Sequence, residues 1–160
     1  MKSAGRILVV DDEEAIRGTL NEYFSTIGYE VVEAGDGAEA LEKFVPGHFD
    51  CVISDLSMPT VGGLDLLKRI KLLDADVPFL IVTGYPGIDS AINAMKEGAY
   101  DYLTKPFRME DIQLRVERAL QGRKTELSLK KVRSMILTLI ILIPVLISLG
   151  IIFGIFWKGM

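Results

Sequence analysis

Short runs of Val, Ile and Leu alternate along most of the chain with longer segments in which apolar residues recur every three or four positions. The short apolar runs predict buried strands, and the longer spacing predicts helices with one face against a sheet. Regular alternation of the two patterns is typical of βα units on a parallel sheet. We therefore expect an α/β fold built on parallel strands.

Five strands and five helices follow from this pattern. The expected strands are residues 6–10, 30–34, 51–54, 79–83 and 100–103. The expected helices are residues 14–27, 37–44, 63–72 and 88–97, with a fifth that begins at Met109. One face of the fifth helix is apolar, as a helix docked on a sheet requires. That face consists of Ile112, Val116, Ala119 and Leu120.

A different pattern begins after residue 134. Residues 135–157 are 23 consecutive positions without a formal charge. As a helix they would be about 35 Å long, against a hydrocarbon core of roughly 30 Å. We expect one C-terminal transmembrane helix here, with a re-entrant hairpin around Pro144 as the alternative. Gly150 and Gly154 have the spacing of a close helix pair, so a homodimer stays open as a further hypothesis.

Charge is distributed unevenly along the chain. Residues 1–122 carry 12 basic and 21 acidic side chains, a net charge of −9, whereas residues 123–134 carry five basic residues and one acidic residue. An acidic domain is a poor ligand for phosphate backbones, so we expect no binding to nucleic acid. The expected organisation is a domain at 1–122, a basic linker or helix extension at 123–134 and the membrane segment at 135–157.

The basic segment also predicts an orientation. Five basic residues precede the apolar segment, and Lys158 alone follows it. By the positive-inside rule the domain then faces the cytoplasm, as part of a single-pass, tail-anchored protein of the cytoplasmic membrane. The residues after Leu120 are too few for both a membrane span and a DNA-binding or enzymatic output module, so we expect neither kind of module.

Polar side chains mark the ends of four predicted strands. Asp11 and Asp12 follow the first strand, Asp55 the third and Lys105 the fifth, and Thr83 ends the fourth. In a parallel sheet these ends share the edge at which α/β folds bind ligands. Crowded carboxylates repel each other unless a cation is present, and Mg²⁺ suits a few carboxylates completed by a carbonyl and waters. Such an ion would neutralise a transferring phosphoryl group, whose oxygens Thr83 and Lys105 could contact.

Each of these residues has a simpler interpretation when taken alone. Asp11 could cap the following helix, Thr83 could be an ordinary strand-end hydroxyl, and Lys105 could be a solvated charge. Their joint occurrence at matched strand ends favours a common site. The single histidine, His48, lies in a loop, so a phosphoryl donor would have to be a partner protein.

Five motifs occur in order at these strand ends: Val9-Val10-Asp11-Asp12-Glu13, Asp55-Leu56-Ser57-Met58-Pro59, Gly62-Gly63, Thr83-Gly84 and Lys105-Pro106-Phe107. Together they resemble the receiver domain of two-component response regulators, over about residues 5–122. The resemblance implies a flavodoxin-like, doubly wound sheet of five parallel strands.

The resemblance also implies the roles of the site residues. Asp55 would be the phosphoacceptor, a nucleophile that takes a phosphoryl group from a phosphohistidine of a histidine kinase or phosphotransfer protein. The side chains of Asp12 and Asp55 and the backbone carbonyl of Ser57 would bind Mg²⁺, with Asp11 orienting the ligands. Lys105 would pair with a phosphoryl oxygen, and its bond to the following proline would be cis.

A switch is implied as well. Thr83 would move to bond the phosphoryl group, and Tyr102 corresponds to the aromatic residue that turns inward behind it. This movement would reshape the surface of residues 88–120 as a population shift between inactive and active states. Ser57 and Tyr85 occupy positions that, in this family, modulate hydrolysis of the acyl phosphate.

We therefore expect a receiver domain that is tethered to the membrane. Its only chemistry would be self-catalysed phosphotransfer to Asp55 and hydrolysis of the phosphoryl group from Asp55. We expect no enzymatic activity on free substrates. Its output partner would be a protein near the membrane. Two alternatives stay open: a membrane adaptor that works without phosphorylation, and a phosphate sink that drains a kinase.

Overall fold

The computed structural model describes residues 4–158, apart from the side chains of residues 126, 130 and 145–158. The chain divides into two compact units, Met1–Arg123 and Lys124–Met160. A five-stranded sheet forms the centre of the first unit, and residues 124–158 of the second unit are helical.

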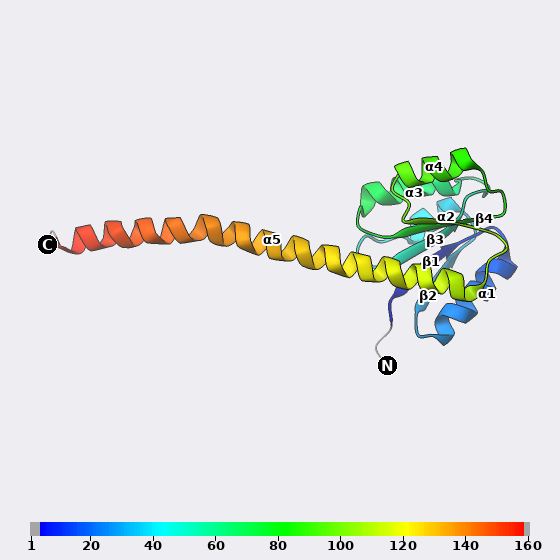
Figure 1. Ribbon diagram of the computed structural model, residues 1–160, viewed down its shortest axis with the longest axis horizontal. Helices are drawn as coiled ribbons and strands as arrows, with labels where there is room; N and C mark the ends of the chain where they lie inside the picture. The colour runs from blue at the N-terminus through cyan, green and yellow to red at the C-terminus, as the bar shows by residue number, and fades with distance from the viewer. Residues whose placement is uncertain (1–3, 159–160) are drawn as a thin grey trace. The chain divides into compact units, whose positions relative to one another are not determined.

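Strands and helices alternate through the first unit (Figure 1). The strands are β1 (Arg6–Val10), β2 (Glu30–Ala34), β3 (Cys51–Asp55), β4 (Phe79–Thr83) and β5 (Asp101–Thr104). The helices are α1 (Glu14–Thr26), α2 (Gly37–Lys43), α3 (Gly63–Leu73), α4 (Ile88–Lys96) and α5 (Met109–Lys158). The predicted bounds differ from these by at most one residue, with β5 lying one residue later than predicted.

All five strands are parallel and lie in the order β2-β1-β3-β4-β5. The chain runs from β1 outward to β2 and then returns to the other side of β1 for β3. The strand order therefore reverses between β1 and β3, which is the topological switch point where such sheets bind ligands. The predicted flavodoxin-like, doubly wound parallel sheet is confirmed.

Both faces of the sheet are buried, which explains the nearly continuous apolar runs of its strands. Successive side chains of a strand point to opposite faces. Leu8 and Val10 of β1 belong to the buried cluster that includes residues of α2, α3 and α4. Ile7 and Val9 belong to the cluster that includes residues of α1 and α5. The predicted apolar face of α5 is confirmed. All four of its residues are buried in the second cluster: Ile112, Val116, Ala119 and Leu120.

Helix α5 continues through residues 121–134 and ends at Lys158, with Pro144 inside it. The basic residues 123–134, for which a linker and a helix extension were both predicted, are helical in this structure. Among the residues whose side chains are described, no helix is long and apolar enough to cross a membrane. Residues 145–157 of the predicted transmembrane segment lie outside those residues.

Close contact between α3 and the end of β3 fixes the backbone next to the strand ends. A Cβ atom at Gly63 would lie 2.0 Å from the carbonyl oxygen of Asp55 and 2.9 Å from the Cα of Leu56. The Gly63 N–H also donates to the Leu56 carbonyl at 2.9 Å. Only glycine fits at the start of α3 without moving this backbone, which explains the glycine at position 63.

Replacing Gly63 by alanine should therefore lower the free energy of unfolding by more than about 2 kcal/mol, because the new methyl group overlaps buried backbone. Gly18 is a matched control, since it also lies in a helix and nothing is within 4 Å of its Cβ position. Gly18→Ala should stabilise the chain by roughly 0.5–1 kcal/mol. Urea unfolding of the full-length chain in detergent measures both variants. Equal unfolding free energies would contradict the close-packing explanation.

Candidate functional site

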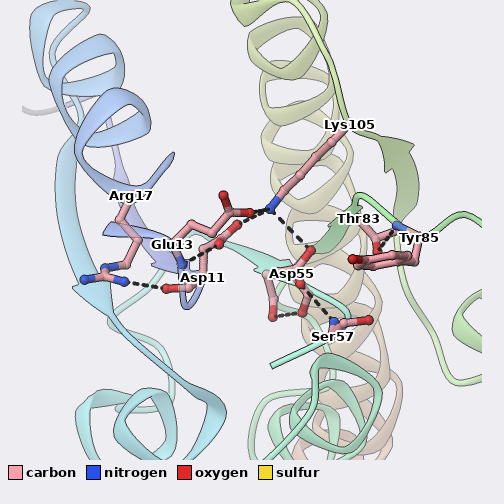
Figure 2. A network of polar contacts seen from close by, with 9 residues as sticks. Asp11, Glu13, Arg17, Asp55, Ser57, Thr83, Tyr85 and Lys105 are labelled. Carbon is pink, nitrogen blue, oxygen red and sulfur yellow. Dashed lines mark hydrogen bonds and ion pairs between the residues drawn. The ribbon is translucent and has the colours of Figure 1, made fainter. Parts of the chain in front are cut away.

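Two aspartates are neighbours at the topological switch point (Figure 2). Val10 of β1 pairs with Ser54 of β3, so the next residues along the two strands are Asp11 and Asp55. Both are buried, with Asp11 3% exposed and Asp55 6% exposed. A buried carboxylate loses its hydration, so each of them needs a partner that carries positive charge or donates hydrogen bonds.

Lys105, directly after β5, supplies the positive charge. Its Nζ donates to Asp11 Oδ2 at 2.7 Å and to Glu13 Oε1 at 3.3 Å, and lies 3.5 Å from Asp55 Oδ1 (Figure 2). The Lys105–Pro106 peptide bond is cis, as predicted. Burial lowers the pKa of Lys105, but the hydrogen bond and charge of Asp11, together with Asp55 and Glu13, outweigh burial and raise the pKa above 10.5. The ammonium group is therefore charged at neutral pH.

The Asp55 carboxylate is bonded at one oxygen only. Its Oδ2 accepts the Ser57 N–H at 2.9 Å, whereas its Oδ1 is buried and has no hydrogen-bond partner. Lys105 attracts this oxygen without the geometry of a hydrogen bond. Burial raises the pKa of Asp55, and the Lys105 charge and the Ser57 N–H offset only part of that effect. Oδ1 is thus available for a further cation or for a covalent bond.

The residues predicted to bind a metal are gathered only in part. Asp11 and Asp55 meet through Lys105. Asp12 is exposed and, among the contacts of the described residues, forms no hydrogen bond or ion pair with them. No group of three or more Asp, Glu, His or Cys side chains in the described part of the chain is arranged to hold a metal ion. The Lys105 ammonium lies between two of the predicted carboxylates, and the third, Asp12, is exposed. Binding of a metal ion by the three carboxylates stays a prediction.

The chemistry of the donors nevertheless suits Mg²⁺. Asp55 Oδ1 is a buried carboxylate oxygen without a hydrogen-bond partner, and carboxylates are the ligands that Mg²⁺ prefers. Ser57 contacts this carboxylate through its N–H. Metal binding by the Ser57 carbonyl stays a prediction.

The two predicted switch residues lie apart from the ion pairs. Thr83 is fully buried, and its Oγ1 accepts the Tyr85 N–H at 3.2 Å (Figure 2). The Tyr102 hydroxyl lies 3.0 Å from Ser90 Oγ on α4, so this ring connects β5 to α4. Tyr85 is 81% exposed, so its ring does not shield Asp55 from water in this structure.

Two residues of this site were missed by sequence reasoning. Glu13 shares Lys105 with the two aspartates, and the Arg17 Nη1 donates to the Asp11 carbonyl at 2.6 Å. The sequence contained an indication of both residues, because residues four positions apart lie on the same face of a helix. Glu13 and Arg17 have that spacing at the start of α1, next to the end of β1.

Two apolar surfaces lie close to the site. A cavity of about 400 Å³ adjoins Lys105 between α1 and the start of α5. Its other lining residues are Ile16, Thr19, Pro106, Phe107 and Met109. The second surface is on α4, where apolar side chains at helical spacing are between 46% and 82% exposed: Ile88, Ile92 and Met95.

Known proteins resemble this chain over its first unit. Residues 7–117 match the sequence profile of the response regulator receiver domain. The regulatory protein AtoC of Escherichia coli is 37% identical over 121 residues, which are 76% of this chain and 26% of that protein. The transcriptional regulatory protein FixJ of Bradyrhizobium diazoefficiens is 39% identical over 122 residues, which are 76% of this chain and 59% of that protein. This chain therefore spans less than two thirds of either curated relative.

Solved structures agree with this match. A response regulator receiver domain protein from Clostridium thermocellum is 36% identical, with a TM-score of 0.73, and the match covers 76% of this chain and 98% of that one. The non-phosphorylated HemR receiver domain from Leptospira biflexa is 34% identical, with a TM-score of 0.69, and the match covers 72% of this chain and 94% of that one.

The raised pKa of Asp55 predicts a dependence of stability on pH. The folded state holds the Asp55 proton more tightly than the unfolded state does. Protonated Asp55 therefore contributes to the stability of the fold below pH 3.8. This contribution is lost as the pH rises through the pKa of Asp55 in the folded state. Asp55→Asn should therefore raise the free energy of unfolding at pH 7, and the gain should disappear below about pH 4.

Urea unfolding at several pH values measures this effect. Asp89, exposed in the first turn of α4, is the control. Asp89→Asn removes a charge that favours the helix N-terminus and should destabilise the chain slightly. If Asp55→Asn has a lower unfolding free energy than the wild type at pH 7, the buried Asp55 charge does not destabilise the folded state.

Proposed function

Because this chain belongs to the response regulator receiver family, we propose that Asp55 is its phosphoacceptor. Receiver domains are phosphorylated on an aspartate and interact with histidine kinases or phosphotransfer proteins. One observation carries the assignment to Asp55. Its buried Oδ1, at the end of β3, has no hydrogen-bond partner and lies 3.5 Å from the Lys105 ammonium.

The proposed reaction is nucleophilic substitution at phosphorus. Asp55 Oδ1 attacks the phosphoryl group of a partner's phosphohistidine. An O–P bond forms while the P–N bond breaks, and the electron pair of that bond remains on the imidazole nitrogen. The Ser57 N–H holds Oδ2 and so orients Oδ1 toward the donor. Lys105 pairs with a phosphoryl oxygen as negative charge spreads over the group.

Magnesium is part of this proposal. Asp11, Asp12 and Asp55 would hold the ion, together with the Ser57 carbonyl. When bound, Mg²⁺ neutralises charge on the transferring phosphoryl oxygens. Hydrolysis of the resulting acyl phosphate, with water as the nucleophile, returns Asp55 to its carboxylate form and releases inorganic phosphate.

The output of phosphorylation would be a change in α4 and β5. The Thr83 hydroxyl, which now accepts the Tyr85 N–H, would bond the phosphoryl group instead. Tyr102 would leave Ser90 and turn into the space behind Thr83. Because Ser90 belongs to α4, loss of this contact would alter the exposed apolar face of that helix, which would then bind a protein near the membrane.

The phosphoacceptor can be tested by incubating the full-length chain with acetyl phosphate and Mg²⁺ and measuring its mass. Wild type and Asp89→Asn should each gain one phosphoryl group, whereas Asp55→Asn should gain none. Peptide mapping should place the modification on Asp55. Equal modification of Asp55→Asn and wild type would exclude Asp55 as the acceptor.

The exposed α4 face favours one alternative, a membrane adaptor that needs no phosphorylation. Ile88 is 82% exposed in this structure, so an apolar partner could bind before any switch. Equal capture of a partner by wild type and Asp55→Ala, with and without beryllofluoride, would favour the adaptor. Phosphorylation without any phosphorylation-dependent partner would instead indicate a phosphate sink.

We further propose that residues 135–157 cross the cytoplasmic membrane and tether the domain on the cytoplasmic side. The support is the 23-residue uncharged sequence and the basic residues before it. Tethering raises the local concentration of the domain near membrane kinases and their targets. Nucleic acid is not proposed as a partner of residues 1–122, because their net charge is −9.

Introducing lysine at Ile140 and Ile143 together should release the chain from membranes, since each lysine near the centre of a span costs about 2.5–3.5 kcal/mol. Alkaline carbonate extraction of bacterial membranes measures the release. The control is Leu72→Lys with Leu73→Lys, because both leucines are exposed in the first unit. Extraction of the wild-type chain by carbonate would contradict the proposed tether.

A further inference from the structure

Arg17 lies beside the phosphorylation site and contacts its backbone. The side chain projects from α1 and is 17% exposed. Its Nη1 donates to the Asp11 carbonyl at 2.6 Å (Figure 2). Its Nε lies 3.6 Å from Glu33 Oε2 on β2. We infer that Arg17 is a positioning residue that fixes the peptide group between Asp11 and Asp12, and through it the direction of the Asp12 carboxylate.

A small set of hydrogen bonds holds the Asp11–Asp12 peptide. Asp11 itself is well held, because its N–H donates to the Ala34 carbonyl at 3.2 Å and its carboxylate accepts from Lys105. Among the described contacts, Arg17 is the one donor to the Asp11 carbonyl. Asp12 is exposed and forms no hydrogen bond or ion pair within the described part of the chain. The Glu13 N–H also donates to Asp11 Oδ1 at 3.0 Å and so closes the loop around Asp12. Together with that bond, the charge-assisted hydrogen bond from Arg17 orients the peptide group from which the Asp12 side chain projects.

Arg17 can hold this carbonyl because its guanidinium group is itself anchored. Glu33 faces the Nε of Arg17, and the other carboxylate oxygen of Glu33 accepts the Asn21 amide, also on α1. The planar fork of a guanidinium can bond a carboxylate and a carbonyl at the same time, whereas a lysine ammonium on a flexible stem lacks this fixed geometry. Replacement by lysine should therefore keep the charge and lose part of the positioning.

This inference rests on the proposed function, because it gives Arg17 a role toward the aspartates of the phosphorylation site. Loss of Arg17 would leave every reacting group in place and would free the Asp12 carboxylate to move relative to Asp55. The expected effect is weaker binding of Mg²⁺, with little change in the rate of phosphorylation once Mg²⁺ is saturating.

Titration of the full-length chain in detergent with Mg²⁺ alone, followed by calorimetry, tests this role without any phosphorylation. Arg17→Ala should weaken Mg²⁺ binding about tenfold, as expected for loss of one charge-assisted hydrogen bond. Arg17→Lys and Glu33→Gln should each cause a smaller shift in the same direction. Arg108→Ala should bind Mg²⁺ like the wild type, because the Arg108 side chain is 77% exposed and is not among the residues of the site.

A second measurement separates positioning from general damage to the fold. With acetyl phosphate as donor, the half-saturating Mg²⁺ concentration of Arg17→Ala should rise by the same factor, while its saturating rate stays within about twofold of the wild type. If Arg17→Ala does not fold, Arg17→Lys and Glu33→Gln decide the question.

Unchanged Mg²⁺ affinity in these variants, a fall in the saturating rate alone, or no Mg²⁺ binding by the wild type would each overturn the role of Arg17. A wild type that binds Mg²⁺ but is not modified on Asp55 would contradict the proposed function, and the calorimetric comparison would still decide the role of Arg17.

Discussion

The Lys105 ammonium joins the ends of β1, β3 and β5 by lying between Asp11 and Asp55. Parallel pairing alone would leave two buried carboxylates side by side at the switch point, where they would repel and favour protonation of one of them. A cation placed directly after β5 removes this repulsion. The charge that stabilises the resting pocket is also the charge that the proposed phosphotransfer would use, because the same ammonium lies 3.5 Å from Asp55 Oδ1.

Two backbone contacts support the pocket on either side of the switch point. On the β3 side, α3 begins so close to the Asp55 carbonyl that only hydrogen fits as a side chain at Gly63. On the β1 side, Arg17 holds the Asp11 carbonyl. Both contacts act on peptide groups next to the acidic side chains, and Asp55 Oδ1 is left without a hydrogen-bond partner.

The fold could be predicted from the sequence because burial on both faces gives the central strands β1, β3 and β4 nearly continuous apolar runs. The one-sided apolar stripe of α5, which includes Ile112 and Val116, indicated how that helix docks. The meeting of Asp11, Asp55 and Lys105 followed from the parallel order of the strands. The exposure of Asp12 could not be predicted, since it depends on side-chain torsions and on the backbone of the loop after β1. Arg17 was missed for a related reason: it acts on a carbonyl group, and backbone carbonyls are common to all residue types.

The three residues of the ion-paired centre come from widely spaced parts of the chain, at positions 11, 55 and 105. During synthesis on the ribosome, Asp11 and Asp55 emerge well before Lys105, which neutralises them. A growing chain that has not yet extruded β5 has no complete pocket. In a chain without β5, the two carboxylates therefore lack the cation that neutralises them.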